Sequence, residues 1–174
     1  MRYVALIAAL VMLSRPQSLA PYVPTPEDVV DRMLALADVN KSDVVIDLGC
    51  GDGRIPIRAA QKYGARGIGV DIDPQLIARS RASARAAGVE HLTEFRLEDG
   101  RATDLTKVSV VTLYLFSAAN LALRPRLQQQ LPAGARVVSH AFSMGPDWPA
   151  DRVETFTSAR GDATTLYLWK IADR

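Results

Sequence analysis

The sequence of 174 residues is poor in the residues that build disulfide frameworks and most metal centres. It contains one cysteine, Cys50, which excludes an intramolecular disulfide and any multi-cysteine metal site. Its two histidines, His91 and His140, do not stand at a metal-ligand spacing. It also has no internal repeat and no low-complexity tract. The sequence therefore predicts no metal centre, and any chemistry depends on other side chains.

An excess of charge of one sign is also absent. The chain has 21 lysines and arginines against 19 aspartates and glutamates, a formal net charge of +2. This small excess is spread along the chain, so it does not favour a nucleic-acid partner. Hydrophobic residues make up 48% of the sequence, which is enough for one substantial core in a single domain.

The sequence lacks an apolar run of the roughly 20 residues that a membrane-spanning helix needs. Its N-terminal run, Val4–Leu13, is shorter; it follows Arg2 and is followed by polar residues that end at Ala20. This pattern is typical of a secretory signal peptide, although Pro21 directly after the expected cleavage point is unfavourable for a signal peptidase.

Two alternatives to an exported signal remain: an uncleaved segment that associates with a membrane through residues 4–13, and a mis-assigned start codon. In each case we predict that residues 1–20 are separate from a folded domain at residues 21–174. The location of the protein stays open between export or membrane association and the cytosol.

A leading helix is predicted just after this segment. Thr25 is a suitable N-cap, Pro26 suits the first helical position, and Glu27 and Asp28 place negative charge at the positive end of the helix dipole. Helical patterns then alternate with strand patterns. Predicted helices lie at residues 54–63, 74–87 and 120–131, the last interrupted at Pro125, and predicted strands at 44–48, 67–72, 92–97, 108–116, 136–142, 153–157 and 164–171.

This order predicts an α/β fold with a doubly wound, mostly parallel seven-strand sheet and a leading N-terminal helix. The last two strands follow one another without a helix, so we expect an antiparallel pair at one edge. The arrangement resembles the doubly wound sheet of class I (Rossmann-like) methyltransferases.

A glycine-rich turn, "DLGCGDG", follows the first predicted strand. Ligands of doubly wound sheets bind at this position. Gly49, Gly51 and Gly53 have the spacing G-x-G-x-G, whereas dinucleotide sites use G-x-G-x-x-G to bind a pyrophosphate. Asp47 and Asp52 would repel a pyrophosphate and would suit the ammonium group of S-adenosylmethionine. The turn therefore favours S-adenosylmethionine over a dinucleotide.

Further acidic residues follow the next two strands. Asp71 ends the second strand at about the interval expected of a residue that binds ribose hydroxyls. Its neighbour Asp73 is the alternative ribose ligand, but it is also a suitable N-cap for the next helix. Asp99, beside Glu98, is positioned to reach the adenine amino group; the alternative is that this acidic pair forms a solvated turn.

Five segments of the sequence resemble a known family: "YVPTPEDVVDRML", "VIDLGCGDGRI", "GVDIDP", "VVTLYLFSAANLALRPRLQQQL" and "GARVVSHAFSMGPDW". Together they look like the small class I methyltransferases related to the mitochondrial lysine methyltransferases of the ATP synthase c-subunit and the adenine nucleotide translocase. The resemblance covers Tyr22 to about Trp148. It implies an S-adenosylmethionine-dependent enzyme that methylates protein lysine.

The export-like N-terminus departs from this expectation, because S-adenosylmethionine is made in the cytosol. The cofactor-binding residues that we predict are Tyr22, Asp47, Gly49, Cys50, Gly51, Gly53, Asp71, Ile72 and Asp99. Cys50 has a second interpretation, as a small packing residue in the loop.

A lysine acceptor must lose a proton before it can be methylated, so we expect an apolar, aromatic-lined channel rather than an obligatory base. The residues predicted to form it are Tyr114, Phe116, Asn120 and His140, with Phe142 nearby. Each has a structural alternative. Tyr114 and Phe142 suit the core, Asn120 can cap a helix, and His140 can be a satisfied buried histidine.

The function predicted from the sequence is methylation of a protein lysine. Two alternatives stay open: a small-molecule methyltransferase on the same scaffold, and a non-catalytic module that binds S-adenosylmethionine.

Overall fold

The computed structural model describes residues 19–173. The apolar run at residues 4–13 lies outside the described residues, and so does the choice between a signal peptide, a membrane-associated segment and a mis-assigned start. Within the described range, none of the helices has both the length and the apolar character that crossing a bilayer requires.

Strands and helices alternate along most of the chain. In order they are α1 (Glu27–Leu36), β1 (Val44–Leu48), α2 (Arg54–Tyr63), β2 (Arg66–Asp71), α3 (Pro74–Ala86), a 3₁₀ turn (Glu90–Leu92), β3 (Thr93–Leu97), β4 (Val110–Leu113), α4 (Ser117–Gln130), β5 (Arg136–His140), β6 (Arg152–Thr157) and β7 (Ala163–Lys170).

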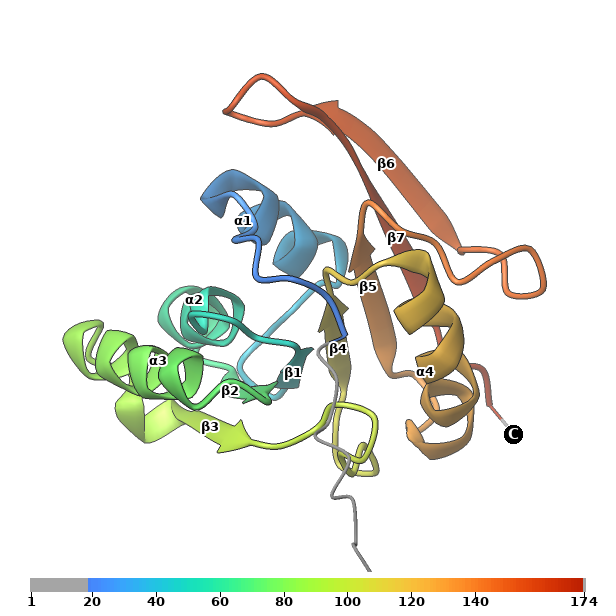
Figure 1. Ribbon diagram of the computed structural model, residues 1–174. Helices are drawn as coiled ribbons and strands as arrows, with labels where there is room; N and C mark the ends of the chain where they lie inside the picture. Colours follow the sequence, from blue (N-terminus) through green and yellow to red (C-terminus); the bar gives the residue numbers. More distant parts are fainter. Residues whose placement is uncertain (1–18, 174) are drawn as a thin grey trace, which may run out of the picture.

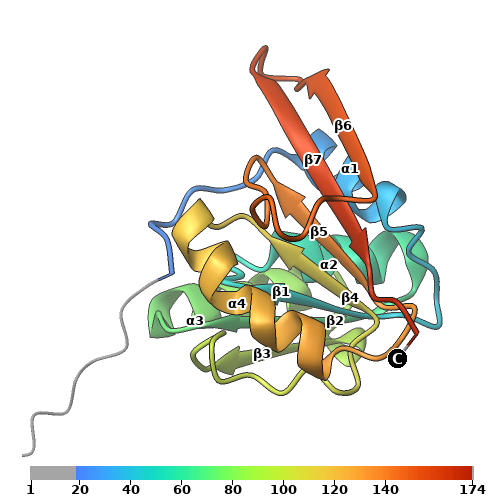
Figure 2. The same ribbon diagram turned by 90° about the vertical axis from the view of Figure 1, so that its right-hand side faces the viewer.

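The strands form a seven-stranded sheet in the order β3-β2-β1-β4-β5-β7-β6. β1 to β5 are parallel, while β7 pairs antiparallel with β5 and with β6. The predicted fold, including the antiparallel pair at one edge, is confirmed. The β6–β7 hairpin extends beyond the rest of the sheet (Figures 1 and 2).

Helices cover both faces of the sheet. α4 lies on one face, where Leu123 and Leu127 pack with buried residues of β1 and β4. α1, α2 and α3 lie on the other face (Figures 1 and 2). Val29 and Met33 of α1 are fully buried there. The two apolar clusters hold the central strands in place between the helical layers.

Three local predictions were wrong, each for a physical reason. Thr25 does not cap α1: Pro26 takes the N-cap position without a side-chain cap, and the buried Thr25 accepts a hydrogen bond from Arg54 through its carbonyl. α4 begins at Ser117 and continues through Pro125, because Leu123 and Leu127 bury on either side of the proline. β4 is shorter than the run of β-branched residues suggested, since its chain leaves the sheet after Leu113.

The predicted N-cap of α3 is confirmed: Asp73 accepts hydrogen bonds from the amides of Gln75 and Leu76. The sheet order reverses between β1 and β4, whose carboxyl ends lie side by side. In doubly wound sheets this reversal is where ligands bind.

Candidate functional site

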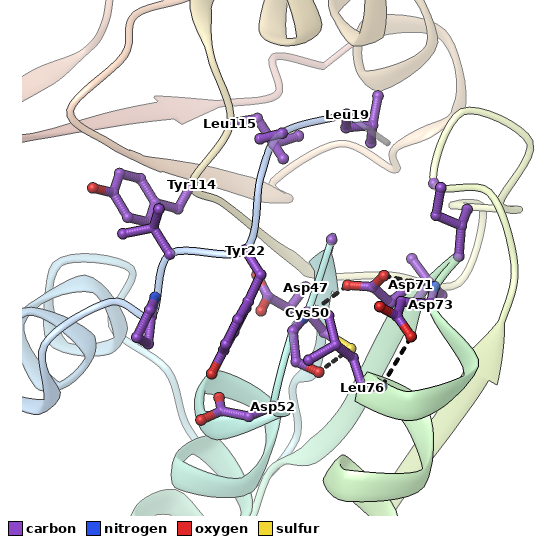
Figure 3. Close-up of a pocket in the computed structure, with 18 of the residues that line it drawn as sticks. Leu19, Tyr22, Asp47, Cys50, Asp52, Asp71, Asp73, Leu76, Tyr114 and Leu115 are labelled. Carbon is purple, nitrogen blue, oxygen red and sulfur yellow. Dashed lines mark hydrogen bonds between the residues drawn. The ribbon is translucent and has the colours of Figure 1, made fainter. Parts of the chain in front are cut away.

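An open cleft of about 570 Å³ lies at the carboxyl ends of β1, β2 and β4. Its walls are the glycine-rich turn, the ends of these strands, the start of the β3–β4 connection and the segment of residues 19–25, which we call the strap. Figure 3 shows the strap crossing the cleft, with Tyr114 on one side of it and Asp71 and Asp73 on the other.

The amides of the glycine-rich turn are already used within the protein. Gly49 and Cys50 both donate to the Val70 carbonyl, at 2.9 Å each, and Gly51 donates to Oδ2 of Asp71 at 3.0 Å. A pyrophosphate site instead needs amides that are free to point at the ligand. The turn is thus unsuited to a dinucleotide phosphate and suited to a ligand that meets its carboxylates.

Two of the glycines are required by what lies against them, and both have a positive φ. A Cβ on Gly51 would lie 2.5 Å from the Tyr22 ring. A Cβ on Gly53 would lie 2.6 Å from the Phe95 ring and 2.8 Å from Ser80, on the side away from the cleft. Gly51 therefore permits the strap to close over the turn, whereas Gly53 permits close packing of the turn on its own domain.

The strap is attached to the turn by a polar cluster. The Tyr22 hydroxyl points toward Asp52 (Figure 3), and burial together with this carboxylate raises the pKa of Tyr22. Arg54 donates to both oxygens of Asp52, at 2.9 and 2.6 Å, and to the Thr25 carbonyl at 2.7 Å. One guanidinium therefore links the turn to the end of the strap.

Asp47 is the most perturbed carboxyl group at the cleft. It is 4% exposed, and its Oδ1 accepts a hydrogen bond from the Thr112 hydroxyl at 2.7 Å. Burial raises its pKa to about 7; the Thr112 hydrogen bond opposes this, while the charges of Asp71 and Asp52 add to it. A cationic ligand would stabilise the ionised form of this buried carboxyl group, so Asp47 is suited to bind a cation.

Asp71 stands at the end of β2, as expected of a ribose ligand. Its two oxygens accept the amides of Gly51 and Asp73, at 3.0 Å each. Each carboxylate oxygen has a second lone pair, so Asp71 can still accept hydroxyl donors from a ligand. Asp73 lines the cleft too, but one of its oxygens is used in the cap of α3.

Asp99 and Glu98 line the far end of the cleft. Hydrogen bonds from Arg101, through both its guanidinium and its amide, hold the pKa of Asp99 below its ordinary value. Asp99 is therefore ionised at neutral pH and fixed in orientation.

On the other side of the strap, Tyr114 lines the cleft with Leu115. The Tyr114 ring packs on His140 with the ring centroids 4.0 Å apart. His140 Nε2 lies 2.7 Å from the Thr164 hydroxyl, and burial lowers the pKa of His140 to about 4, so its ring is neutral at physiological pH. His140 does not line the cleft and instead supports Tyr114.

Asn120 and Phe116 also lie outside the cleft wall. Asn120 is fully buried; its amide group donates to the Phe142 carbonyl at 3.0 Å and to the Ser139 hydroxyl at 3.1 Å. Phe116 is half exposed and packs edge-on against Phe142, with the ring centroids 5.6 Å apart. Asn120 thus positions the loop that follows β5, and Phe116 directly follows Leu115 of the cleft wall.

Most of the predicted cofactor residues therefore meet at one cleft, and Gly53 is the one that does not line it. Cys50 does line it, although it is buried, and burial raises the pKa of its thiol. Of the predicted acceptor residues, the cleft wall contains Tyr114.

Sequence reasoning missed most of the strap and missed Arg54. Leu19 and Ala20, which it assigned to the preceding segment, line the cleft as well. No sequence signal marked Leu19 and Ala20, since this part of the strap has no regular secondary structure. Among residues 19–173, no cluster of three or more His, Cys, Asp or Glu side chains could hold a metal ion.

Comparison with known proteins finds methyltransferases. A profile of the ANTKMT methyltransferase domain matches residues 47–152. A protein-lysine N-methyltransferase of Saccharolobus islandicus is 42% identical over 149 residues, which are 85% of this chain and 92% of that protein. The Xenopus laevis lysine N-methyltransferase of the ATP synthase c-subunit is 32% identical over 133 residues, 76% of this chain but 58% of that protein.

A solved structure with high similarity carries a different description. It is the crystal structure of an RNA methyltransferase from Salinibacter ruber in complex with S-adenosyl-L-homocysteine. The sequence identity is 51% and the TM-score 0.81, over 87% of this chain and 95% of that chain.

Proposed function

Because this chain belongs to the family of the ANTKMT methyltransferase domain, we propose that it methylates lysine side chains of a protein substrate. It is an S-adenosylmethionine-dependent methyltransferase with the class I fold. The proposal rests on one observation above others: the cleft is acidic, and the side of it that an acceptor would enter is apolar and aromatic.

The residues of the cleft fit S-adenosylmethionine. Asp47 and Asp52 suit its cationic amino acid part, Asp71 suits the ribose hydroxyls, and Asp99 suits the adenine amino group. The amides of Gly49 and Cys50 are already bonded, as expected where no phosphate has to be held. When bound, S-adenosylmethionine supplies an electrophilic methyl group on a sulfonium ion.

The chain's own part in the reaction is to position the acceptor and keep it neutral. Holding a lysine of pKa near 10.4 in the neutral form at pH 7 costs roughly 4 to 5 kcal/mol in water. Tyr114 and Leu115 form an apolar wall, and desolvation there lowers the pKa of an ammonium group. His140 is neutral behind Tyr114, so it adds no positive charge that would repel the lysine or compete with it for the carboxylates.

Charge also distinguishes a lysine from a nucleic acid. Within residues 19–173, six carboxyl side chains line the cleft, those of Asp47, Asp52, Asp71, Asp73, Glu98 and Asp99. In the same range one guanidinium lines it, that of Arg54, and it is bound by Asp52. This field attracts an ammonium group, whereas the phosphates of RNA need cations at the site.

Methylation of RNA is the second candidate function, because the similar Salinibacter ruber structure is described as an RNA methyltransferase. A test has to separate the two directly. The full-length protein, with radiolabelled S-adenosylmethionine, is mixed with protein, RNA and small-molecule fractions of cell extract. An Asp47→Asn protein serves as the inactive control.

We expect label in protein that survives ribonuclease and hydrolyses to methyllysine. Label that ribonuclease removes would replace the proposal with the second candidate. Label confined to small molecules would indicate the small-molecule alternative, and donor binding without any transfer would indicate a non-catalytic module.

Gly51 provides a test of the strap. Replacing Gly51 with alanine puts a methyl group against the Tyr22 ring in a backbone of positive φ, so the strap can no longer close. We expect the Kd for S-adenosylhomocysteine, measured by calorimetry, to rise about tenfold. In a Tyr22→Ala background the same substitution should cost clearly less. Equal costs in both backgrounds would show that the strap is not what Gly51 accommodates.

A further inference from the structure

Among residues 19–173, six large apolar side chains are exposed to solvent, those of Tyr22, Val23, Leu97, Phe116, Leu121 and Val153. Tyr22 and Val23 line the cleft, and Phe116 directly follows Leu115, which lines it. Exposed apolar patches of this kind mark surfaces that bind a partner.

Phe116 belongs to a small patch that we call the apolar rim, formed by Phe116, Leu121 and Phe142. Phe116 is 50% exposed and Leu121 44% exposed. Phe116 packs edge-on against Phe142, and Leu121 lies against Gly145 of the same loop. The rim therefore joins the start of α4 to the loop after β5.

Partly buried hydrogen bonds hold the loop of the rim in place. The Phe142 carbonyl accepts from Asn120 and, at 2.6 Å, from the Ser139 hydroxyl. The Met144 carbonyl accepts from Arg124 at 3.0 Å. A surface fixed in this way loses little conformational entropy when it binds a partner.

We propose that the apolar rim binds an apolar side chain of the substrate protein, located within about four residues of the acceptor lysine. The inference rests on the proposed function and deepens it. The rim is continuous with the acceptor side of the cleft, because Phe116 is one residue from the wall formed by Tyr114 and Leu115. A substrate whose lysine enters beside Tyr114 has to pass this surface.

The spacing follows from chain geometry. Adjacent Cα atoms are about 3.8 Å apart, so the rim begins at the cleft wall itself. A substrate chain advances about 1.5 Å per residue in a helix and about 3.4 Å in a strand. A side chain that reaches the rim while its neighbouring lysine occupies the cleft is thus close to that lysine in sequence.

The charges around the rim favour a protein segment over RNA. The charged residues of Phe116–Arg124 and of residues 141–149 are Arg124 and Asp147, and they pair with each other at 3.3 Å. Aromatic rings can stack on RNA bases, but single-stranded RNA also needs free cations along its backbone. The rim offers apolar contact without such cations.

Two synthetic peptides of equal length and charge test the proposal, each with one central lysine. One has leucines on both sides of the lysine, and the other has serines at the same positions. We expect the leucine peptide to have a kcat/KM about tenfold higher, as partial burial of one leucine side chain implies. The difference should lie in KM, because docking binds substrate and transition state alike.

The variant Phe116→Ser should bring the ratio of the two kcat/KM values close to one. Phe116 occupies the N-cap position of α4 without a side-chain cap, and serine is a preferred N-cap, so the variant is expected to fold. The matched control is Val153→Ser on β6, which removes a similarly exposed apolar side chain away from the cleft and should keep the ratio. Unchanged binding of S-adenosylhomocysteine confirms an intact donor site in both variants.

The outcomes distinguish a failure of the rim proposal from a failure of the proposed lysine methylation. Equal kcat/KM for the two peptides, or a preference that Phe116→Ser keeps, overturns the rim proposal alone. If neither peptide accepts label and RNA does, the proposed function falls and the rim proposal falls with it.

Discussion

Replacing Asp47 with asparagine is expected to raise the Kd for S-adenosylmethionine at least about 100-fold while it stabilises the ligand-free protein, increasingly so as pH rises from about 4 to 7. The two effects have one cause. Asp47 is a buried carboxyl group at the end of β1 whose pKa burial raises to about 7. Asparagine keeps its shape and can still accept the Thr112 hydroxyl, but it cannot carry the negative charge.

The stability effect has a defined pH dependence. The folded state of the ligand-free protein holds the Asp47 proton up to about pH 7, whereas the unfolded chain releases it near pH 3.8. Between these values the folded state binds the extra proton, so the stability of the wild-type protein falls as pH rises through this window. The shift of about three pK units corresponds to about 4 kcal/mol. The Asn variant does not lose this stability, because its side chain does not ionise.

The measurement is thermal or urea unfolding of both proteins at pH 5 and pH 8, with calorimetric titration of the cofactor. We expect the variant to be the more stable protein at both pH values, with its advantage larger at pH 8 than at pH 5 by about 3 kcal/mol. Undiminished cofactor binding by the variant would mean that Asp47 has been wrongly placed in the donor site. A stability difference that does not depend on pH would contradict the account of its protonation.

Replacing Asp43 with asparagine is expected to do the opposite: to destabilise the protein by about 3 kcal/mol and leave cofactor affinity unchanged. Asp43 stands just before β1, at the other end of the strand from Asp47, and it is 5% exposed. Its carboxylate pairs with Arg136 and accepts hydrogen bonds from Ser109 and Asn40. Burial raises the pKa of Asp43, but these partners outweigh it and hold the pKa below its ordinary value.

The Asn variant leaves the Arg136 guanidinium buried beside a neutral group. A buried charge without its counter-charge is the main reason why breaking a buried ion pair destabilises a protein. Arg136 keeps its bonds to the carbonyls of Ala37 and Asp38, so the loss is partial. Because the pKa of Asp43 is lowered, its contribution is present above about pH 4 and is lost as pH falls through the folded pKa.

Urea unfolding at pH 7 measures this loss. The control is Asp31→Asn, which removes a partly exposed carboxylate that pairs with Arg58 and Lys62. Surface pairs contribute at most about 1 kcal/mol, so this variant should unfold almost like the wild type. If the Asp43 and Asp31 variants lose the same small amount, the buried pair does not stabilise the fold.

The sequence predicts the fold well where local signals and periodicity agree. The alternation of strands and helices indicated a mostly parallel seven-strand sheet with an antiparallel pair at one edge, and Asp73 indicated the start of α3, because each element carries its own pattern. The errors occurred where tertiary contacts overrule local preference. Burial of Leu123 and Leu127 carries α4 through Pro125, and the chain leaves β4 early to place Tyr114 in the cleft.

The site was predictable where a residue stands at the end of a strand, since the topology brings strand ends together. This holds for Asp47, Asp71 and Tyr114. The contribution of the strap could not be predicted in full, because it is an irregular segment held by Arg54 and by the missing side chain of Gly51. The positioning role of Asn120 depends on a loop carbonyl 22 residues away in sequence, which no local pattern marks.

Natural selection acts differently on Asp47 and Asp43, which stand at the two ends of one strand. Selection for a stable fold alone retains Asp43 and favours the loss of Asp47, whose buried carboxyl group destabilises the ligand-free protein. Only selection for the bound cofactor keeps Asp47. Among descendants of this sequence, a protein that no longer transfers methyl groups should therefore lose Asp47 early and keep Asp43. The presence of both aspartates then indicates an active enzyme, and the presence of Asp43 alone indicates a protein that is folded but inactive.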